Sequence, residues 1–393
     1  MSQQLISRSP DLQALFEDGY EVSIRAGHIV ISNVPYVGSD KSIKRGTLVS
    51  TLDLAGDKTT TPSTHVIQFA GEHPCDKHGH PLKNMVHSAG RKNLGDGLVT
   101  DRSFSCKPTG GYPDYYDKFT TYIAMISGPA EAIDPSVSAR TFAVIETSDT
   151  DSPFRYIDTA SSRAGIAAIT EKLKLSKIAI VGLGGTGSYI LDLLAKTPVG
   201  EIHLIDGDDF IQHNAFRTPG AASVDDLRKR LKKVDYLSEK YGAMRRGIVP
   251  HASHLAQHNL SLLDGMDFVF VAVDRSEIKA AISKKLETDG IPFIDVGMGV
   301  SIVDDALFGV VRTTTSTSLQ RSHFEKCVNV GPNGVDDAYR QNIQIADLNA
   351  LNAALAVIRW KKFCGFYVDL EQEHQSNFTI DGNIITNSYF HET

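Results

Sequence analysis

The stretch KIAIVGLGGTGSYILDLLAKTPVGEIHLIDGDDFIQHNAFR, from Lys177 to Arg217, carries the strongest structural signal in this chain. It reads as an apolar strand, a glycine-rich loop, a helix from about residue 187 to 196, a second apolar strand and an acid, Asp206. This order is typical of a parallel βαβ unit whose helix N-terminus faces phosphate. The glycines expected to let backbone amides approach a nucleotide are Gly182, Gly184, Gly185 and Gly187.

The residues beyond this unit continue to alternate between strands and helices. Buried strands are expected within DFVFVAVD (Asp267–Asp274) and PFIDVGMGV (Pro292–Val300), because both runs are almost entirely apolar. Helices are expected after each of them, the last from about Ile343 to Phe363. The alternation predicts an α/β domain over residues 160–393, with a Rossmann-like, mainly parallel sheet covered on both faces.

Two connections in this domain are also interpreted from their residues. The run SVDDLRKRLKKVDYLSEKYGAM (223–244) has an apolar face with helical spacing and predicts one helix, which begins with a capping box of Ser223 and Asp226. The run TTTSTSLQRSH (Thr313–His323) is polar, and we expect a loop there. Gly365 is expected to end the last helix.

The N-terminal part, residues 1–150, predicts a smaller α+β domain. EVSIRAGHIVIS (Glu21–Ser32) alternates in the manner of a hairpin, with Ala26 and Gly27 at its turn. ETSDTDSP (Glu146–Pro153) is polar and rich in turn-forming residues, and is expected to be the linker between the domains.

Composition excludes several classes of protein. The chain has 393 residues, 41% of them hydrophobic, and a net charge of -7, so two globular domains are expected and no basic field invites nucleic acid. The four cysteines form no disulfide framework, which favours the reducing cytoplasm. No apolar run is long enough for a membrane span, and the first residues do not read as a signal peptide.

The residues after the second strand decide between a redox cofactor and ATP. Asp206 can bind the ribose of either nucleotide. Arg217 lies beyond that strand, however, and Asp274 closes the run FVFVAVD, so a cation and a carboxylate are expected at the ligand edge of the sheet. Nucleotidyl transfer needs such cations and Mg²⁺, whereas hydride transfer needs neither. Lys232 and Lys233 join this set, unless they form a solvated helix face.

As an ordered set, the motifs GLGGTG, LIDGDDF, HNAFR, KKV and AVD resemble the ThiF/MoeB/ubiquitin-activating-enzyme superfamily over residues 161–365. The resemblance implies ATP and Mg²⁺ as cofactors. It also implies adenylation of the C-terminal carboxylate of a ubiquitin-like or sulfur-carrier protein ending in glycine. A homodimer is implied as well, and a conjugating enzyme would be a further partner.

The resemblance also implies roles for individual residues. Asp206 and Asp208 would bind the nucleoside, while Asn214 and Arg217 would contact the triphosphate. Lys233 would bind phosphate, and Asp274 would position Mg²⁺. Arg163, ahead of the first strand, matches an arginine that a partner subunit often donates, although a plain surface arginine is an equal alternative.

The cysteines differ from the pattern of many superfamily members, and one of them could take part in a second reaction step after adenylation. Many members hold zinc on two CxxC pairs, which this chain lacks, so that zinc is not expected. Some members transfer the activated protein to a cysteine. Cys327 stands at a matching place, near His323 and Lys326, which would lower its pKa. Cys364, beside Gly365, is interpreted as structural.

The N-terminal domain contributes two ambiguous clusters. GEHPCDKHGHP (71–81) gathers histidines and a cysteine, which could hold zinc, but their spacing is not that of a recognised zinc finger and favours polar loop residues. KPTGGYPDYYDKFTTY (107–122) gathers tyrosines, which suit either a partner interface or a core. We expect this domain to bind a partner.

Three alternatives to activation of a ubiquitin-like protein stay open on the sequence. The first is adenylation of a carboxylate on tRNA or on a peptide, which keeps the fold. The second is an NAD-dependent oxidoreductase, which leaves Arg217 and Asp274 without a function. The third is a non-catalytic nucleotide-binding partner, against which the full set of phosphate and metal residues argues.

Overall fold

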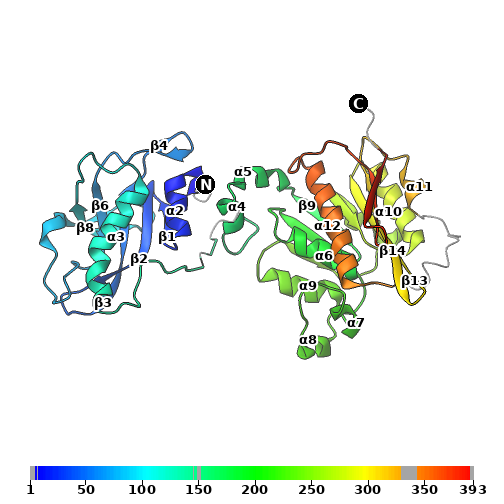
Figure 1. Cartoon of the computed structure of the whole chain (residues 1–393), viewed down its shortest axis with the longest axis horizontal. Coiled ribbons are helices and arrows are strands. Elements are labelled where there is room, and N and C mark those ends of the chain that lie inside the picture. Colours follow the sequence, from blue (N-terminus) through cyan, green and yellow to red (C-terminus); the bar gives the residue numbers. More distant parts are fainter. Residues whose placement is uncertain (1–4, 7, 145, 148–151, 329–342, 390–393) are drawn as a thin grey trace. The chain divides into compact units, whose positions relative to one another are not determined.

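The computed structural model describes residues 5–6, 8–144, 146–147, 152–328 and 343–389, and Figure 1 shows its elements in chain order. The chain divides into two compact units. The first comprises Met1–Glu146 and Ile157–Ala168, and the second comprises Thr147–Tyr156 and Ile169–Thr393. Residues 148–151 of the segment expected to be a linker lie outside the described residues.

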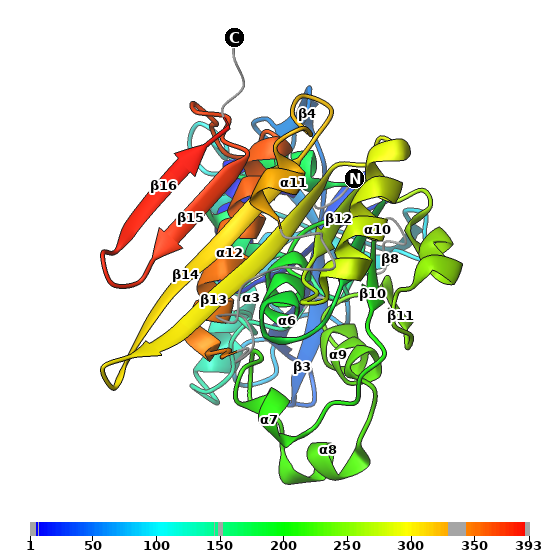
Figure 2. The same cartoon turned by 90° about the vertical axis from the view of Figure 1, so that its right-hand side faces the viewer.

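The C-terminal unit is built on an eight-stranded sheet in the order β11-β10-β9-β12-β13-β14-β15-β16. The first five strands in this order are parallel and the last three extend the sheet antiparallel, as Figure 2 shows. The strands are β9 (Lys177–Val181), β10 (Glu201–Ile205), β11 (Ile248–His251), β12 (Phe268–Val271), β13 (Phe293–Val303), β14 (Ala306–Ser316), β15 (Gln375–Thr379) and β16 (Ile384–Ser388). The mainly parallel α/β sheet expected from the sequence is therefore confirmed.

Helices cover both faces of the sheet and bury its apolar strands. On one face α6, α9 and α12 pack with Phe268 and Phe270 into one core, which includes the buried Trp360. On the other face α10 and η3 pack against Val269 and Phe293. The helices of this unit are α5 (Ala167–Thr170), η2 (Glu171–Leu173), α6 (Gly185–Leu194), α7 (Gln212–Ala215), α8 (Val224–Lys229), α9 (Lys233–Gly242), η3 (Gln257–Leu263), α10 (Ser276–Thr288), α11 (Phe324–Cys327) and α12 (Ala346–Phe363).

The prediction of a loop over Thr313–His323 is wrong for its first residues, because Thr313–Ser316 complete β14. Thr314 is buried, and its hydroxyl donates to Gln375 Oε1 on β15 at 2.5 Å. The hydroxyl of Thr313 donates to Asn352 on α12. Threonine is β-branched and favours strands, and these hydrogen bonds satisfy its hydroxyl on burial, so polarity alone misleads here.

The single helix expected over residues 223–244 is also wrong. Its start is confirmed, because Ser223 and Asp226 form the capping box, but α8 ends at Lys229 and Arg230 adopts a left-handed φ of 50°. The chain then pairs with the acidic loop, where the N–H of Phe210 donates to the carbonyl of Leu231. This pairing replaces helical hydrogen bonds and starts α9 at Lys233, beside the carboxyl ends of the strands.

The N-terminal unit has a six-stranded antiparallel sheet, β1-β2-β3-β6-β8-β7, against which α2 and α3 pack. The hairpin of β1 and β2 is confirmed, with Ala26 and Gly27 at positive φ in its turn. The elements are α2 (Pro10–Glu17), β1 (Glu21–Arg25), β2 (His28–Val37), β3 (Ile43–Thr51), β4 (Leu54–Ala55), β5 (Lys58–Thr59), β6 (Val66–Ala70), η1 (Lys83–Met85), β7 (Val86–Asn93), β8 (Val99–Ser105), α3 (Tyr115–Glu131) and α4 (Thr159–Arg163).

The tyrosine cluster of this unit belongs mainly to its core. Tyr112, Tyr115 and Tyr122 are buried, and their hydroxyls donate to backbone carbonyls, as Tyr122 does to His65 O at 2.6 Å. Of the two interpretations, core packing is the one that the contacts support. In the part of the chain that the structure describes, no helix is long and apolar enough to cross a membrane.

A buried arginine lies at the C-terminal end of α6, the helix that follows the glycine-rich loop. Arg245 is fully buried and its guanidinium donates only to backbone carbonyls, among them Leu194 O, Thr197 O and Gly200 O. Burial lowers the pKa of Arg245 to about 10. The cation also opposes the negative end of the helix dipole.

Replacing Arg245 by methionine should destabilise the C-terminal unit by at least ~3 kcal/mol, because several buried carbonyls lose their donor. Urea unfolding followed by the fluorescence of Trp360, the only tryptophan, measures this unit directly. Arg228→Met is the matched control, because Arg228 is exposed and forms a surface ion pair with Asp225; a change below ~0.5 kcal/mol is expected. Equal effects of the two substitutions would contradict the prediction.

Candidate nucleotide site

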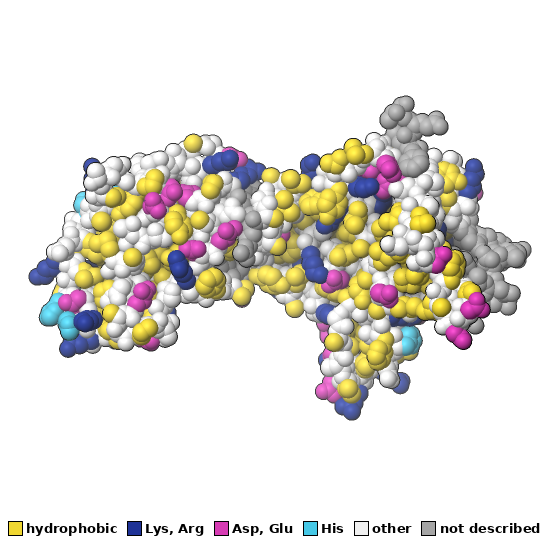
Figure 3. Space-filling model, in the orientation of Figure 1, with side chains coloured by type: hydrophobic (Ala, Val, Ile, Leu, Met, Phe, Trp, Pro, Cys, Tyr) yellow, Lys and Arg dark blue, Asp and Glu magenta, His cyan; other side chains and the backbone are white. Residues whose placement is uncertain are grey.

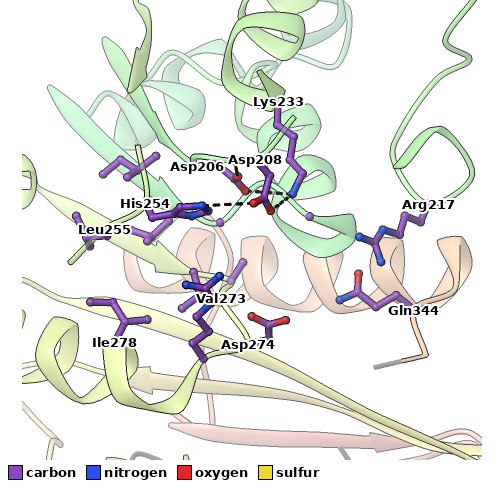
Figure 4. Close-up of a pocket in the computed structure, with 16 residues that line it drawn as sticks. Asp206, Asp208, Arg217, Lys233, His254, Leu255, Val273, Asp274, Ile278 and Gln344 are labelled. Carbon is purple, nitrogen blue, oxygen red and sulfur yellow. Dashed lines mark hydrogen bonds and ion pairs between the residues drawn. The ribbon is translucent and has the colours of Figure 1, made fainter. Parts of the chain in front are cut away.

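A cavity of about 250 Å³ opens at the carboxyl ends of the parallel strands. Figure 4 shows its polarity: Leu255 and Ile278 lie at one end, the acids near the middle, and Arg217 at the other end. The residues that line it are Val181, Gly182, Gly184, Ile205, Asp206, Asp208, Arg217, Lys233, His254, Leu255, Ala272, Val273, Asp274, Arg275, Ile278 and Gln344. The structure thus brings together most of the residues that the sequence selected.

The glycine loop needs its glycines for close backbone approach. Gly182 has a φ of 89°, and a Cβ there would lie 2.6 Å from the carbonyl oxygen of Ala272. A Cβ on Gly187 would collide with the carbonyl of Gly182, and one on Gly185 with the amide of Asn349 on α12. The helix starts at Gly185, two residues earlier than expected, directly after Gly184, which lines the cavity.

Asp206 joins the glycine loop to the acidic loop. It is buried at the end of β10, where Oδ2 accepts the N–H of Leu183 at 2.7 Å and Oδ1 accepts the N–H of Asp208 at 2.8 Å. Each carboxylate oxygen keeps a second lone pair for a ligand. The residue predicted to bind ribose therefore also holds the backbone that lines the site.

Lys233 lies between two carboxylates. Its Nζ is 2.6 Å from Asp208 Oδ2 and 3.6 Å from Asp206 Oδ2, and its side chain is almost fully buried. The hydrogen bond from Lys233 is the main cause that lowers the pKa of Asp208. Lys232 instead pairs with Asp209 at 2.7 Å and donates to the carbonyl of Gly207 at 3.0 Å. Of the two lysines, Lys233 is the one that lines the cavity.

Arg217 lies at the other end of the cavity, and Asp274 lies on its wall between that end and the apolar end, as Figure 4 shows. Burial lowers the pKa of Arg217, while Asp274 and Asp208 raise it, and its Nε has no hydrogen-bond partner among the described residues. Asp274 is exposed and lies between β12 and α10, three residues beyond the strand end at Val271, where the sequence placed it on the strand itself. Asn214 is not among the residues that line the cavity; it is buried and accepts the N–H of Ile211, which fixes the start of α7.

Sequence reasoning missed the loop that follows β11. His254 and Leu255 from this loop line the cavity, and His254 Nε2 lies 3.5 Å from Asp208 Oδ1. Gly207 allows this contact, because a Cβ there would lie 2.7 Å from the imidazole of His254. One signal in the sequence could have found His254: it follows shortly after β11, and β11 pairs parallel with β10.

Possible metal ligands lie in the cavity, and the sequence also suggested a group of them in the N-terminal unit. Among the described residues, the acids and histidine that could share one ion are Asp206, Asp208 and His254. The cluster of histidines in the N-terminal unit does not form such a group: Cys75 is buried with its thiol on the carbonyl of His73, and His80 contacts Asp76. Asp274 can hold Mg²⁺ as a single carboxylate, because that ion keeps several waters and substrate phosphates.

The remaining predicted residues lie outside this cavity. Cys327 ends α11, and burial raises the pKa of its thiol, although a hydrogen bond with Tyr389 and the charges of Arg312 and Lys326 oppose this. The prediction that His323 and Lys326 lower the pKa of Cys327 is therefore wrong. Burial raises the pKa of Cys364 to about 12, in keeping with a structural role. Arg163 is the last residue of α4, in the N-terminal unit.

Two protein-family models match this chain, and they meet at residue 159. Residues 159–348 match the ThiF family, and residues 10–159 match a family described as "Domain of unknown function (DUF6791)". Residues 159–348 therefore form a ThiF-family domain, and the superfamily that the motifs indicated is confirmed for this part of the chain.

Individual relatives match over shorter lengths. A tRNA threonylcarbamoyladenosine dehydratase of Haemophilus influenzae is 28% identical over 130 residues, 32% of this chain and 49% of the relative. A ubiquitin-like modifier-activating enzyme 5 of Culex quinquefasciatus is 32% identical over 82 residues, 20% of this chain and 21% of the relative. The chain thus spans half or less of the length of these relatives. Escherichia coli MccB with ATP has 20% identity and a TM-score of 0.43, over 58% of this chain and 68% of that one.

Gly187→Ala should reduce ATP affinity by more than tenfold, because its Cβ collides with the Gly182 carbonyl and displaces the loop that faces phosphate. Calorimetric titration of the purified protein with ATP measures the change. Gly242→Ala, in α9, is the matched control, because a Cβ there meets nothing within 4 Å. Unchanged ATP affinity in folded Gly187→Ala protein would remove the loop from the nucleotide site.

Proposed function

We propose that the C-terminal unit binds ATP with Mg²⁺ and transfers AMP to a carboxylate. The observation that carries this proposal is the cavity itself, in which an apolar end, a helix N-terminus and the partly buried cation Arg217 follow one another. An adenosine triphosphate presents groups of matching polarity in the same order. A buried cation that lacks a full set of partners is favourable only when an anion accompanies it.

Each part of the nucleotide has a proposed contact. The base packs between Leu255 and Ile278, and Asp206 accepts from the ribose. The phosphates lie against the N–H groups of the glycine loop at Gly182, Gly184, Gly185 and Gly187. Asn214 and Arg217 contact the triphosphate, and Asp274 would hold Mg²⁺, which would supply positive charge beside the phosphates.

The chemistry follows from these contacts. A carboxylate oxygen attacks the α-phosphorus of ATP, the bond to the bridging oxygen breaks, and pyrophosphate leaves with the electron pair. Negative charge grows on the transferred phosphoryl group and on the leaving group. Arg217 and the helix N-terminus stabilise this charge in the transition state more than in the ground state. Mg²⁺ supplies further positive charge when it is bound.

Lys233 requires a change of partner in this scheme. In the structure its ammonium group is neutralised by Asp208 and lies close to Asp206. We propose that phosphate attracts this ammonium group away from Asp208 when ATP binds, because a polyphosphate carries more charge than one carboxylate. Asp208 is then free to bind another group of the nucleotide.

The acceptor that we favour is the C-terminal carboxylate of a ubiquitin-like or sulfur-carrier protein, or of a peptide. One similar protein is a ubiquitin-like modifier-activating enzyme, which supports a protein acceptor. The net charge of -7 argues against a large nucleic acid. On the face that Figure 3 shows, basic side chains of the described residues are scattered among acidic ones. tRNA is the second candidate, favoured by the similarity to dehydratases that act on it.

A redox function fits the same cavity less well. An NAD-dependent enzyme would leave Arg217 and Asp274 unused at the end where a nicotinamide ring needs an apolar contact. The partners that we propose beyond the acceptor rest on the superfamily: a second copy of this chain that donates Arg163, and a conjugating enzyme bound by the N-terminal unit. We place the reaction in the cytoplasm, where ATP is supplied.

Arg217→Ala and Asp274→Asn should each lower ATP–pyrophosphate exchange by about 10²–10³-fold, because the first removes a cation that stabilises the transition state and the second removes the carboxylate that would hold Mg²⁺. Isotope exchange in the presence of an acceptor measures this. The matched control is Arg228→Ala, on the exposed surface of α8. Near-normal exchange in either folded variant would remove that residue from the mechanism.

The acceptor class is tested with the same assay. Exchange is measured with peptides ending in a free C-terminal glycine, with the same peptides as C-terminal amides, and with total tRNA. We expect exchange with the free carboxylate alone. Exchange with tRNA and not with peptides would replace the protein acceptor by tRNA, and NADH binding without ATP binding would overturn the adenylation proposal.

Cys327 is the residue to which we propose that the activated protein is then transferred, as a thioester. Its raised pKa means that the resting thiol is protonated at neutral pH, so transfer needs the thiolate that Arg312 and Lys326 favour. With ATP and an acceptor protein, a reductant-sensitive adduct should form and should be lost in Cys327→Ala. Cys106→Ala is the control. An undiminished adduct in Cys327→Ala, seen by gel and mass spectrometry, would exclude this residue.

A further inference from the structure

Arg275 is a cation of the cavity wall that the proposed mechanism does not use. It follows Asp274 directly and stands at the start of α10, where its side chain is exposed and lines the cavity. Among the described residues its guanidinium group forms no hydrogen bond and no ion pair. An arginine without such a partner at the wall of a ligand cavity is available to bind an anion.

The two other cations that line the cavity already have a partner or a proposed role. Lys233 lies 2.6 Å from Asp208 and 3.6 Å from Asp206, and its side chain is almost fully buried. Arg217 lies at one end of the cavity, as Figure 4 shows, and we have assigned it to the triphosphate. Arg275 is therefore the cation that is left to meet a second substrate.

The position of Arg275 along the cavity follows from its neighbours. Ile278, one helical turn further along α10, lies at the apolar end in Figure 4, and Asp274 lies nearer the middle. The hydrogen bond from Lys233 is the main cause that lowers the pKa of Asp208, and the charge of Arg275 adds to it. Arg275 thus belongs to the middle of the cavity. The α-phosphate lies there when the base occupies the apolar end and the outer phosphates occupy the other.

The proposed reaction brings two anions together at this point. The attacking carboxylate must come within about 3–3.5 Å of the α-phosphorus, and the negative charges of the two groups oppose that approach. A cation that contacts the carboxylate offsets this repulsion. A guanidinium group suits this task, because its planar fork donates two parallel hydrogen bonds to a carboxylate. Arg275 is also exposed, so an acceptor can reach it from solvent after the nucleotide has bound.

We propose that Arg275 binds the attacking carboxylate of the acceptor and holds it beside the α-phosphate. The inference rests on the proposed adenylation. In that reaction one carboxylate oxygen forms a bond to the α-phosphorus, the bond from this phosphorus to the pyrophosphate oxygen breaks, and pyrophosphate leaves with the electron pair. Arg275 keeps all its protons. A carboxylate accepts both hydrogen bonds of the fork, whereas a carboxamide has only one oxygen, so Arg275 also selects acceptors with a free C-terminus.

Labelling of arginine side chains with phenylglyoxal tests this contact directly. The full chain is saturated with Mg²⁺ and α,β-methylene-ATP, whose P–C bond resists cleavage, and is labelled with no peptide, with triglycine or with triglycine amide. Mass spectrometry gives the rate at which Arg275 is modified. Triglycine should slow this rate by about fivefold or more, whereas the nucleotide analogue alone and triglycine amide should each change it by less than about twofold. Arg228, on the exposed surface of α8, should be modified at one rate in all samples.

Substitution separates binding of the acceptor from binding of ATP. In Arg275→Ala, the triglycine concentration that gives half-maximal ATP–pyrophosphate exchange should rise by about tenfold or more, because a charge-assisted bidentate contact is lost. The affinity for ATP, measured by calorimetry without triglycine, should stay unchanged. Arg275→Lys should restore part of the affinity for triglycine, because it keeps the charge without the fork. Arg228→Ala is the matched control and should leave both quantities unchanged.

The outcomes distinguish this inference from the proposed function. If the nucleotide analogue alone protects Arg275 from labelling, the guanidinium group contacts a phosphate of ATP and the inference is overturned. Equal labelling with triglycine and with its amide overturns it as well, and so does an Arg275→Ala variant that weakens ATP and triglycine alike. Absence of nucleotide binding to the unmodified protein would overturn the proposed function, and this inference with it.

Discussion

The two backbone hydrogen bonds that Asp206 accepts are the contacts on which the nucleotide site depends. One comes from Leu183 in the glycine loop and the other from Asp208 in the acidic loop. Because the carboxylate is buried, these bonds are strong and fix both loops relative to the ends of β9 and β10. The direction of the free N–H groups of α6 follows from this arrangement, and so does the position of Asp208 beside Lys233 and His254.

Charge is arranged along the cavity in a way that the fold alone does not require. At one end Lys233 is neutralised by two acids, whereas at the other Arg217 is partly buried and its Nε lacks a partner among the described residues. The site therefore has a balanced half and a cationic half. A ligand with an uncharged nucleoside and a charged tail has the matching distribution, which is why a nucleotide fits better than an ion or an apolar molecule.

The C-terminal extension of the sheet brings the last helix to the same site. Strands β14 and β15 bury threonines and glutamine whose side chains bind one another, and α12 packs on this layer and on α6. Asn349 of α12 accepts a hydrogen bond from Thr186 and lies against Gly185. The helix α12 therefore also supports the glycine loop. Contacts between residues so distant in the chain explain why the polar strand was mistaken for a loop.

The sequence by itself determined the elements whose signal is local. The apolar runs, the glycine loop, the capping box at Ser223 and the stop at Gly365 each depend on neighbouring residues, and the predicted sheet, its order of motifs and the grouping of Asp206, Arg217, Lys233 and Asp274 followed from them. Only the tertiary structure decided the break at Arg230, the strand at Thr313–Ser316, the raised pKa of Cys327 and the place of His254. Each of these depends on burial or on pairing with a segment far away in the chain, and no pattern within a short stretch of residues records such a partner.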